Sequence, residues 1–464
     1  MIKARAVVVL DVGKTHVRVF AIEPHGGQVV ESYQTSNRSL DEAPYFHVDV
    51  ERIWAWLIGA LSDLGKKVEI LAIVPCAYGS TAALIDEDGL VLPMMDYEAE
   101  PPADIVSAYA SLAPDFAEVC CPVSPGALTL GRQLFWQSQH HPKAFARMRW
   151  ILMAAQYWAW RLTGKVAIEP TSLGAQTQLW NPRTGAFTGL ARNRGWCERF
   201  PALAKPFDEV GPLRPDLTKD LGLQTNPPVL VGIHDSNANY ARYLAAGFRR
   251  FTLISSGTWL ITFDTNLVLD RLDPTRDMVA NTDLEGRPVA CTRFMGGREF
   301  FEIAGAAGLK VEPGLHDLEG ILKEKTMAIP SFSNSGGPFP GSGHQGRIEG
   351  PAPETVEKKS ALAALYVALV TDVDLDLLDS DGDVIVDGSF AENDLFCGLL
   401  AALRSGQRVM VSKEPNGTAL GASLLFGWQS RTEPVSLNLD AVASFDLEKL
   451  ASYKALWRSR LGLE

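Results

Sequence analysis

The stretch that decides the fold is Asp11-Val12-Gly13-Lys14-Thr15-His16-Val17-Arg18. An apolar run at residues 6–10 precedes it and a second run at 17–22 follows it, which predicts two strands joined by a polar tip. Glycine allows a tight turn whose successive N–H groups suit phosphate oxygens, and a carboxylate beside such a turn can hold Mg²⁺ through water. The alternative is an ordinary β-turn with an Asp-Gly signal.

A second polar tip, Ser255-Ser256-Gly257-Thr258, lies between predicted strands at residues 250–254 and 259–263. Each tip stands near the start of one half of the chain, so the halves repeat in architecture although not in sequence. Alone, this tip is also compatible with a structural turn. As a pair, the two tips predict a site in which a triphosphate lies between paired hairpins.

A third motif is Gly232-Ile233-His234-Asp235. The apolar residues 229–233 predict a buried strand that delivers Asp235 to the edge of a sheet, where ligands of α/β proteins commonly bind. A carboxylate there could accept a hydroxyl proton as general base. The alternative is a helix N-cap, because residues 237–246 have a helical pattern.

The remaining pattern predicts elements of both types. We expect a turn at 24–27, a helix over 51–64, a strand over 68–74 and two helices between 130 and 163 that end at Gly164. In the second half we expect a long loop over 330–350, a helix over 360–378, a strand over 384–386 and a helix of small residues from Thr418.

Composition limits the classes of function. With 464 residues, the chain is long enough for two domains of about 200 residues. A hydrophobic fraction of 46% without a long apolar run predicts a globular cytoplasmic protein with no membrane span. A net charge of −12 argues against nucleic acid as a partner but not against ATP, whose phosphates are often held by backbone amides.

Two residue types tempt one toward metal sites. The six cysteines lack zinc-type spacing, so we expect buried, reduced thiols. The aspartates between 372 and 383 lack the glycine and terminal glutamate of a calcium loop, and we expect a solvated helix end there.

In order and spacing, the three motifs resemble those of the FGGY family of carbohydrate kinases, within the actin-like ATPase superfamily. Residues 384–393 (VIVDGSFAEN) resemble the family's adenosine motif, residues 418–424 its closing helix, and residues 134–164 its LFWQ…RLTG stretch. The resemblance covers nearly the whole chain.

The resemblance implies an α/β fold of two actin-like (ribonuclease H-like) lobes, each a mixed β-sheet flanked by helices, with the active site in the interlobe cleft. It implies a sugar-binding lobe over 1–245 and an ATP-binding lobe over 246–464. Asp235 would be the catalytic base, and Asp11 and Asp235 would serve Mg²⁺. The residues implied to contact ATP are Gly13, Lys14, Thr15, Gly257, Thr258, Gly388 and Asn393.

Residues 77–86 look closest to the rhamnulokinase and fuculokinase branch, which implies a ketose or deoxyketose substrate. The residues implied to contact the sugar are Gly79, Ser80, Thr81, Tyr97, His234 and Asp235. Three departures stand out: Thr81 replaces an aspartate, Lys14 a small residue and Ser389 a glycine of the adenosine loop. Asp96 and Glu98 also fall where relatives contact substrate.

Two other functions remain open: a polyol kinase of the same family, and an actin-like ATPase switch that phosphorylates no small molecule. A homodimer is expected only at the level of the family.

Overall fold

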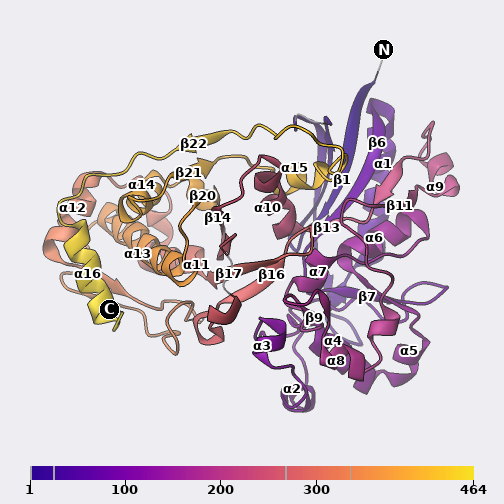
Figure 1. Ribbon diagram of the computed structural model, residues 1–464, viewed down its shortest axis with the longest axis horizontal. Helices are drawn as coiled ribbons and strands as arrows, with labels where there is room; N and C mark the ends of the chain where they lie inside the picture. Colours follow the sequence, from indigo (N-terminus) through magenta and orange to yellow (C-terminus); the bar gives the residue numbers. More distant parts are fainter. Residues whose placement is uncertain (1–2, 25–26, 267–268, 335, 464) are drawn as a thin grey trace. The chain divides into compact units, whose positions relative to one another are not determined.

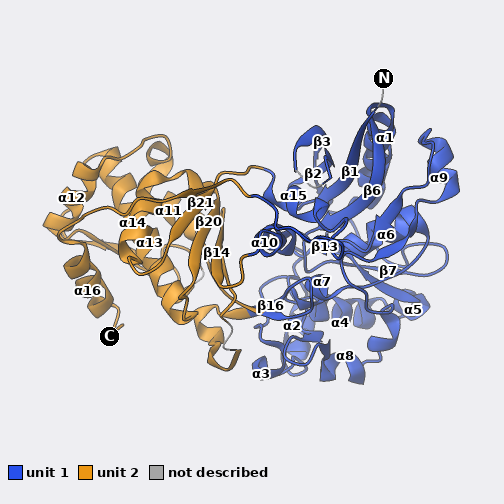
Figure 2. Cartoon of the chain, turned by 45° about the horizontal axis from the view of Figure 1, so that its top comes forward, with its two compact units in different colours: residues 1–247, 280–288, 416–436 blue, residues 248–279, 289–415, 437–464 orange. Residues whose placement is uncertain are grey.

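The computed structural model describes residues 3–24, 27–266, 269–334 and 336–463 (Figure 1). The turn predicted at 24–27 therefore lies partly outside the described residues. The chain divides into two compact units (Figure 2). Unit 1 comprises residues 1–247, 280–288 and 416–436, and unit 2 comprises residues 248–279, 289–415 and 437–464. Unit 1 thus includes two segments from beyond the single boundary expected near residue 245.

Unit 1 is built on a seven-stranded mixed sheet in the order β11-β12-β6-β1-β2-β3, with β13 also paired to β6. Its strands are β1 (Ala4–Val12), β2 (His16–Ile22), β3 (Val29–Ser36), β6 (Val68–Ala77), β11 (Glu209–Pro212), β12 (Pro228–Leu230) and β13 (Ile233–His234). The predicted hairpin is confirmed, because β1 and β2 pair antiparallel. Strand β6 runs parallel to β1, and β13 runs parallel to β6.

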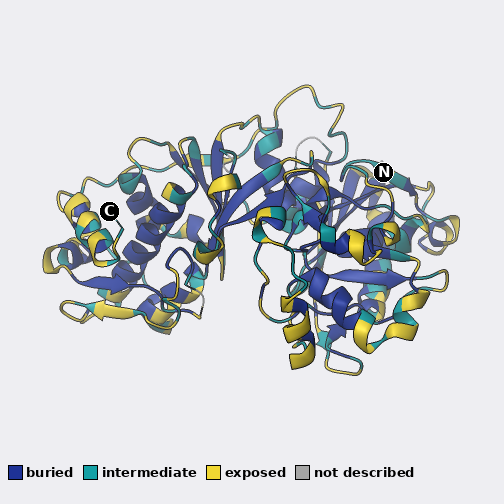
Figure 3. Cartoon of the chain, turned by 60° about the horizontal axis from the view of Figure 1, so that its bottom comes forward, coloured by how far each residue is buried: buried dark blue, intermediate teal, exposed yellow. Residues whose placement is uncertain are grey.

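Helices bury both faces of this sheet, and the alternation of β1 assigns each side chain to a face. Val8 and Leu10 pack into the core that includes α1 (Val50–Lys67) and α6 (Ala154–Thr163). Val7 and Val9 pack into the opposite core, with α10 (Asp235–Ala245) and α15 (Gly417–Ser423). The strands are accordingly buried in Figure 3, while exposed residues gather on peripheral helices and loops. Asp11 continues the row of Val7 and Val9 and therefore faces the α10 side.

The predicted helix pair between 130 and 163 is wrong in part. Helices α4 (Leu130–His140) and α5 (Pro142–Arg147) form, but β8 (Trp150–Met153) separates them from α6 and pairs with β7 (Ala82–Ile85). A short buried strand and a buried helical turn have the same apolar pattern, so periodicity could not distinguish them. The predicted stop is confirmed, because Gly164 ends α6 at φ +72°.

The remaining elements of unit 1 are short. They are β4 (Ser39–Leu40), β5 (His47–Val48), α2 (Ala103–Ala110), α3 (Phe116–Val119), α7 (Pro170–Gly174), β9 (Trp180–Asn181), β10 (Ala186–Phe187), α8 (Gly189–Asn193) and α9 (Pro215–Asp220).

Unit 2 contains most of a second seven-stranded mixed sheet, in the order β16-β17-β15-β14-β20-β21-β22. Its strands are β14 (Phe251–Ser256), β15 (Leu260–Asp264), β16 (Val279–Thr282), β17 (Pro288–Phe294), β20 (Asp383–Gly388), β21 (Val409–Ser412) and β22 (Leu439–Ala441). The other elements are α11 (Gly296–Gly308), α12 (Leu315–Glu324), β18 (Met327–Ile329), β19 (Arg347–Glu349), α13 (Val356–Leu377), α14 (Asp394–Leu403) and α16 (Leu450–Arg460).

The expected solvated helix end and turn at the acidic run are found for the later aspartates, since Asp376 and Asp381 are exposed, but the expectation is wrong for Asp372 and Asp374. Asp372 and Asp374 lie fully buried in α13, a helix that packs against α11, α12 and α14. Asp372 is paired with Lys454 at 2.7 Å and with Arg458 at 3.2 Å, which ties α16 to α13. The alternation of aspartate and apolar residues concealed a helix that is buried almost all round.

Two expectations from composition agree with the structure. Five of the six cysteines are buried, and Cys197 is partly exposed. Across the described ranges, no helix is both long enough and apolar enough to cross a membrane.

The small-residue helix α15 packs directly on α10, which carries Asp235 at its first position. A Cβ atom at Gly421 would lie 1.8 Å from the carbonyl oxygen of Ala238, so only glycine fits there. We therefore expect Gly421→Ala to lower the free energy of unfolding by roughly 1–3 kcal/mol, measured by urea denaturation.

Gly59 provides the matched control for this substitution. It lies within α1, and a Cβ atom there would have no neighbour within 4 Å. Gly59→Ala should raise stability by about 0.5–1 kcal/mol through helix propensity. Equal effects of the two substitutions would contradict the close packing of α15 on α10.

Candidate active site

Two carboxylates meet where three strands of unit 1 end. Asp11 on β1 is in register with Cys76 on β6, and Cys76 is in register with Ile233 on β13. Asp235 follows β13 directly and is the first residue of α10, whose N-cap is His234. Asp235 therefore does not cap the helix, and its Oδ1 accepts the N–H of Ser236 at 2.6 Å.

The strand predicted over 229–233 is interrupted before it reaches this edge. Strand β12 ends at Leu230 and β13 begins at Ile233. Between them, Gly232 has φ +88°, and a Cβ atom there would lie 2.3 Å from the carbonyl oxygen of Pro75. The glycine allows the chain to bend against β6 and then resume pairing beside Asp11.

Electrostatics confirm that the carboxylates are close together. Asp11 is only 8% exposed; burial and then the nearby Asp235 raise its pKa to about 7, although Arg18 opposes the shift. Burial, followed by Asp11, Asp235 and Glu169, also raises the pKa of the Cys76 thiol. Repulsion between two ionised carboxylates falls when a divalent cation lies between them, and hard oxygen donors suit Mg²⁺. The residues present thus fit a magnesium site.

A chain of hydrogen bonds orients His234 beside Asp235. The Asn237 amide donates to the carbonyl oxygen of Thr282 at 2.7 Å, so its oxygen accepts from His234 Nδ1 at 2.8 Å. This assigns the proton to Nδ1 and leaves Nε2 as an acceptor in the neutral ring. His234 Nε2 lies 3.4 Å from Asp235 Oδ1.

Glu169 is linked to the same histidine through Thr171. Its fully buried carboxylate accepts the N–H groups of Thr171 and Ser172 at the start of α7. Thr171 Oγ1 in turn accepts the backbone N–H of His234 at 3.0 Å. Burial raises the pKa of Glu169, partly offset by these hydrogen bonds.

Gly79, predicted to contact substrate, lies against this histidine, and Ser80, also predicted to contact substrate, follows it in the chain. A Cβ atom at Gly79 would come 2.8 Å from His234 Nε2, so glycine keeps the space beside the ring. Ser80 has φ +55°, an unusual value for serine, and Gln133 Nε2 holds its carbonyl oxygen at 2.6 Å. Thr81 is fully buried, so a sugar could touch it only if its side chain were uncovered.

The tip of the first hairpin is fixed by one residue. Asn37 donates its side-chain amide to the carbonyl oxygen of Gly13 at 2.8 Å and its backbone N–H to that of Thr15 at 2.8 Å. The Gly13 N–H itself bonds to the carbonyl oxygen of His16 at 2.9 Å. Lys14 extends from this tip to ion pairs with Asp96 and Glu98, beside the ring of Tyr97.

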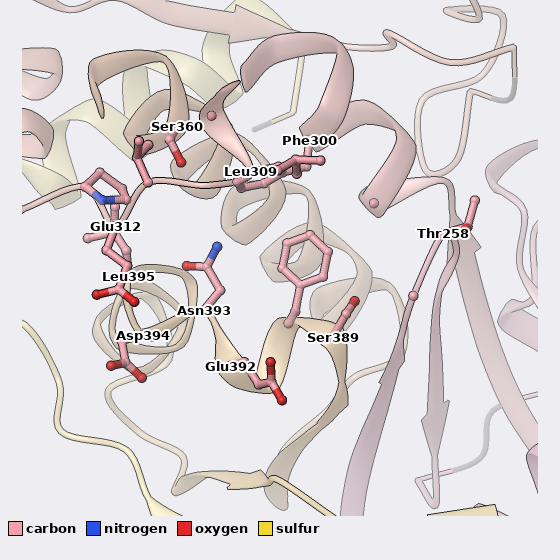
Figure 4. Close-up of a pocket in the computed structure, with 16 residues that line it drawn as sticks. Thr258, Phe300, Leu309, Glu312, Ser360, Ser389, Glu392, Asn393, Asp394 and Leu395 are labelled. Atoms are coloured by element: carbon pink, nitrogen blue, oxygen red, sulfur yellow. The ribbon is translucent and has the colours of Figure 1, made fainter. Parts of the chain in front are cut away.

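In unit 2, a cavity of about 710 Å³ brings together three of the seven predicted nucleotide residues, Gly257, Thr258 and Asn393 (Figure 4). Thr258 lies at one end of the cavity, away from Asn393, and Ser389 lies between them (Figure 4). Gly257, next to Thr258 in the chain, also lines the cavity. The other lining residues are Gly297, Phe300, Gly308, Leu309, Val311, Glu312, Pro313, Ser360, Phe390, Glu392, Asp394 and Leu395.

Gly388 has a structural task next to this cavity. It has φ +86°, and a Cβ atom there would lie 2.1 Å from the carbonyl oxygen of Ser256, its neighbour across β14 and β20. Gly297, at the start of α11, approaches Gly257 just as closely. Backbone contacts thus hold the second tip and the adenosine motif side by side.

The side-chain oxygen of Asn393 is already hydrogen-bonded within the protein. Its Oδ1 accepts the N–H of Phe396 at 2.9 Å and so caps α14. The amide nitrogen points into the cavity, toward Leu309 and Ser360 (Figure 4). The sequence did not predict the wall formed by Phe300, Leu309 and Glu312, because these residues belong to no recognisable motif.

Comparisons with known proteins decide the family. Residues 6–240 match the FGGY family of carbohydrate kinases, N-terminal domain, and residues 248–434 match the carbohydrate kinase FGGY, C-terminal domain. The chain belongs to the FGGY family of carbohydrate kinases. The predicted resemblance is therefore confirmed.

Curated relatives of this FGGY protein are distant in sequence. The chain is 24% identical to the L-fuculokinase of Salmonella typhi over 273 residues, which is 56% of either chain. It is 24% identical to the rhamnulokinase of Oceanobacillus iheyensis over 257 residues, 54% of either chain. The matched part thus spans about half the length of these relatives.

Solved structures of FGGY proteins match over the whole chain. A carbohydrate kinase from Novosphingobium aromaticivorans is 32% identical, with a TM-score of 0.91 over 99% of both chains. A xylulose kinase from Rhodospirillum rubrum, at 17% identity, has a TM-score of 0.82 over 99% of this chain and 98% of its own. The predicted fold class, two actin-like α/β lobes, is confirmed by these likenesses.

The pKa of Asp11 predicts how stability depends on pH in the metal-free protein. Between the ordinary value of 3.8 and about 7, the folded state holds a proton that the unfolded state releases. The free energy of unfolding should therefore fall as pH rises through this window. Asp11→Asn cannot ionise, so it should be more stable than the wild type at pH 8 by roughly 2–4 kcal/mol, and about equal at pH 4.5.

Urea denaturation with a chelator present measures this difference. Asp63→Asn is the control, because Asp63 is a surface residue paired with Lys66. A difference between Asp11→Asn and the wild type that stays constant from pH 4.5 to pH 8 would refute the raised pKa.

Proposed function

We propose that this protein is an ATP-dependent kinase that phosphorylates a hydroxyl of a small sugar, a ketose or deoxyketose, with Asp235 as general base. The observation that carries the proposal is the convergence of Asp11 and Asp235 at the ends of β1 and β13. Membership of a family of carbohydrate kinases supports it. The names of the L-fuculokinase and rhamnulokinase relatives support a ketose-type substrate.

ATP would occupy the cavity of unit 2. Its adenosine would lie near Asn393 and the loop after Gly388, and its phosphates near the backbone of Gly257 and Thr258. The tip at Gly13 and Thr15 is the second proposed phosphate contact. Transfer requires that both tips reach the same terminal phosphate.

Mg²⁺, when bound, would neutralise charge on the transferred phosphoryl group. Asp11 and Asp235 are the residues that would hold it, directly or through water. Arg18, the register partner of Asp11, balances part of their charge when no cation is present.

Asp235 would remove the hydroxyl proton as the sugar attacks phosphorus. The neighbouring His234 Nε2 is held as an acceptor, so it can take a hydrogen bond from Asp235 once that carboxylate carries the proton. Gly79, Ser80, Thr81, Tyr97 and His234 are the proposed sugar contacts. The chemistry asks for alignment more than for covalent work, which suits a site fixed by buried hydrogen bonds.

Asp235→Asn tests the proposed base. It should lower kcat for sugar-dependent ADP release at least about 100-fold, because the amide cannot accept the proton, while ATP affinity changes little. A coupled assay measures kcat, and calorimetry measures ATP binding. Asp63→Asn, far from the strand ends in α1, is the matched control.

Outcomes of a substrate screen separate the alternatives. Release of ADP with ketoses or deoxyketoses supports the proposal, whereas release only with polyols such as glycerol or erythritol indicates a polyol kinase. Slow ATP hydrolysis that no sugar stimulates would indicate an actin-like switch. Near-normal turnover by Asp235→Asn would exclude Asp235 as the base.

Substitutions of Asn393 test the nucleotide cavity. Asn393→Asp keeps an oxygen that can cap α14 but replaces the cavity-facing amide with a negative charge. It should retain thermal stability and weaken ATP binding at least about tenfold. Asn393→Ala should lose both properties. If Asn393→Asp binds ATP as tightly as the wild type, the nucleotide lies elsewhere.

A further inference from the structure

Lys14 lies at the tip of the β1–β2 hairpin, and its partners are carboxylates. Its ammonium pairs with Asp96 and lies 3.0 Å from Glu98. The same ammonium lies 4.9 Å from the ring centre of Tyr97 and 5.5 Å from that of Phe46. All these residues belong to unit 1, so the cluster is complete within one unit.

Asp96 is the anchor of this cluster because it has no exposed surface. Its carboxylate accepts from Lys14, from the Ser39 hydroxyl and from the N–H of Glu98, the last at 2.8 Å. Among the described residues, Lys14 is the one cation within ion-pair distance of it. A buried carboxylate that loses its cation is costly, so this pair is strongly held.

The cluster connects the phosphate side of unit 1 to its sugar side. Asn37 binds the hairpin tip, and Ser39, two residues later, binds Asp96. Lys14 links the hairpin tip to the segment 96–98 through its ion pairs with Asp96 and Glu98. Tyr97 then contacts the ring of Tyr78, next to Gly79 and His234, with ring centres 5.6 Å apart.

The charge balance of the cluster is negative. One ammonium faces the two carboxylates of Asp96 and Glu98, and Asp235 contributes a further negative potential at Tyr97 and Tyr78. The Lys14 ammonium is therefore already ion-paired with protein carboxylates when no ligand is bound. A carboxylate on a substrate would meet net negative charge here, whereas hydroxyl groups would meet acceptors.

We propose that Lys14 is a positioning residue of the sugar site, which fixes Asp96 and Tyr97 rather than binding phosphate, and that the site takes an uncharged sugar instead of a sugar acid. The inference rests on the proposed kinase function for its kinetic test. It departs from the assignment of Lys14 to ATP suggested by the sequence motif.

Four variants separate the sugar role of Lys14 from a phosphate role: Lys14→Met, Lys14→Arg, Asp96→Asn and the double variant Lys14→Met/Asp96→Asn. Lys66→Met is the matched control, because it removes the ammonium of an exposed ion pair in α1. The measurements are KM for the sugar found by the screen, KM for ATP, kcat and the thermal midpoint.

We expect Lys14→Met to raise KM for the sugar at least about tenfold while KM for ATP changes less than about twofold. Lys14→Arg should recover part of the sugar affinity. The double variant removes both charges, so it should have a higher midpoint than Lys14→Met but still bind sugar weakly. A raised KM for ATP with an unchanged KM for the sugar, in Lys14→Met or the double variant, would overturn the proposal.

The charge of the substrate is tested on the wild type. An uncharged ketose should exceed the aldonate of the same carbon number in kcat/KM by at least about 100-fold, because the aldonate carboxylate is repelled and unpaired. A preference for the aldonate would overturn this part of the proposal.

Failure of the kinase assignment would be visible separately, as wild-type protein that releases no ADP with any sugar. Lys14 is then judged by the thermal shift that each sugar produces without ATP. A shift in the wild type and Lys66→Met that Lys14→Met lacks supports the positioning role. No shift in any protein, or equal shifts in all of them, would overturn it.

Discussion

Two neighbouring carboxylates, the buried Asp11 and the partly exposed Asp235, impose the strongest constraint on this structure. Asp11 and Asp235 come from segments more than two hundred residues apart, yet parallel pairing of β1 and β13 with β6 brings both to one sheet edge. Burial and mutual repulsion make the ionised pair unfavourable, as the raised pKa of Asp11 shows. Such an arrangement persists because the surrounding fold is stable without it, and its electrostatic cost is relieved when a cation binds.

Close backbone contacts make that arrangement rigid. Gly232 lets the chain reach β13 against Pro75, and Gly421 lets α15 lie on the helix that begins with Asp235. In unit 2, Gly388 and Gly297 do the same for the tip at Gly257. At each of these points a side chain would overlap a neighbouring main chain, so close packing fixes these loops in addition to their hydrogen bonds.

Sequence reasoning predicted what short-range patterns encode. The hairpins, the order of the motifs and the small-residue helix follow from turn chemistry and periodicity, and the structure has them. The strand at 150–153 was missed because a buried strand and a buried helix share one apolar pattern. The burial of Asp372 was missed because its ion-pair partners lie on α16, some eighty residues away. The ion pair of Lys14 with Asp96 was not predicted because the two residues are 82 positions apart.

The charged residues of each unit bear on how the phosphates of a bound nucleotide would be neutralised. The residues that line the cavity of unit 2 include Glu312, Glu392 and Asp394 but neither lysine nor arginine. In unit 1 the ammonium of Lys14 is already paired. On the proposed function, a nucleotide in the cavity of unit 2 would meet no lysine or arginine among these lining residues. The proposed Mg²⁺ at Asp11 and Asp235 would add positive charge to acidic surroundings, which is why the proposed function includes a metal.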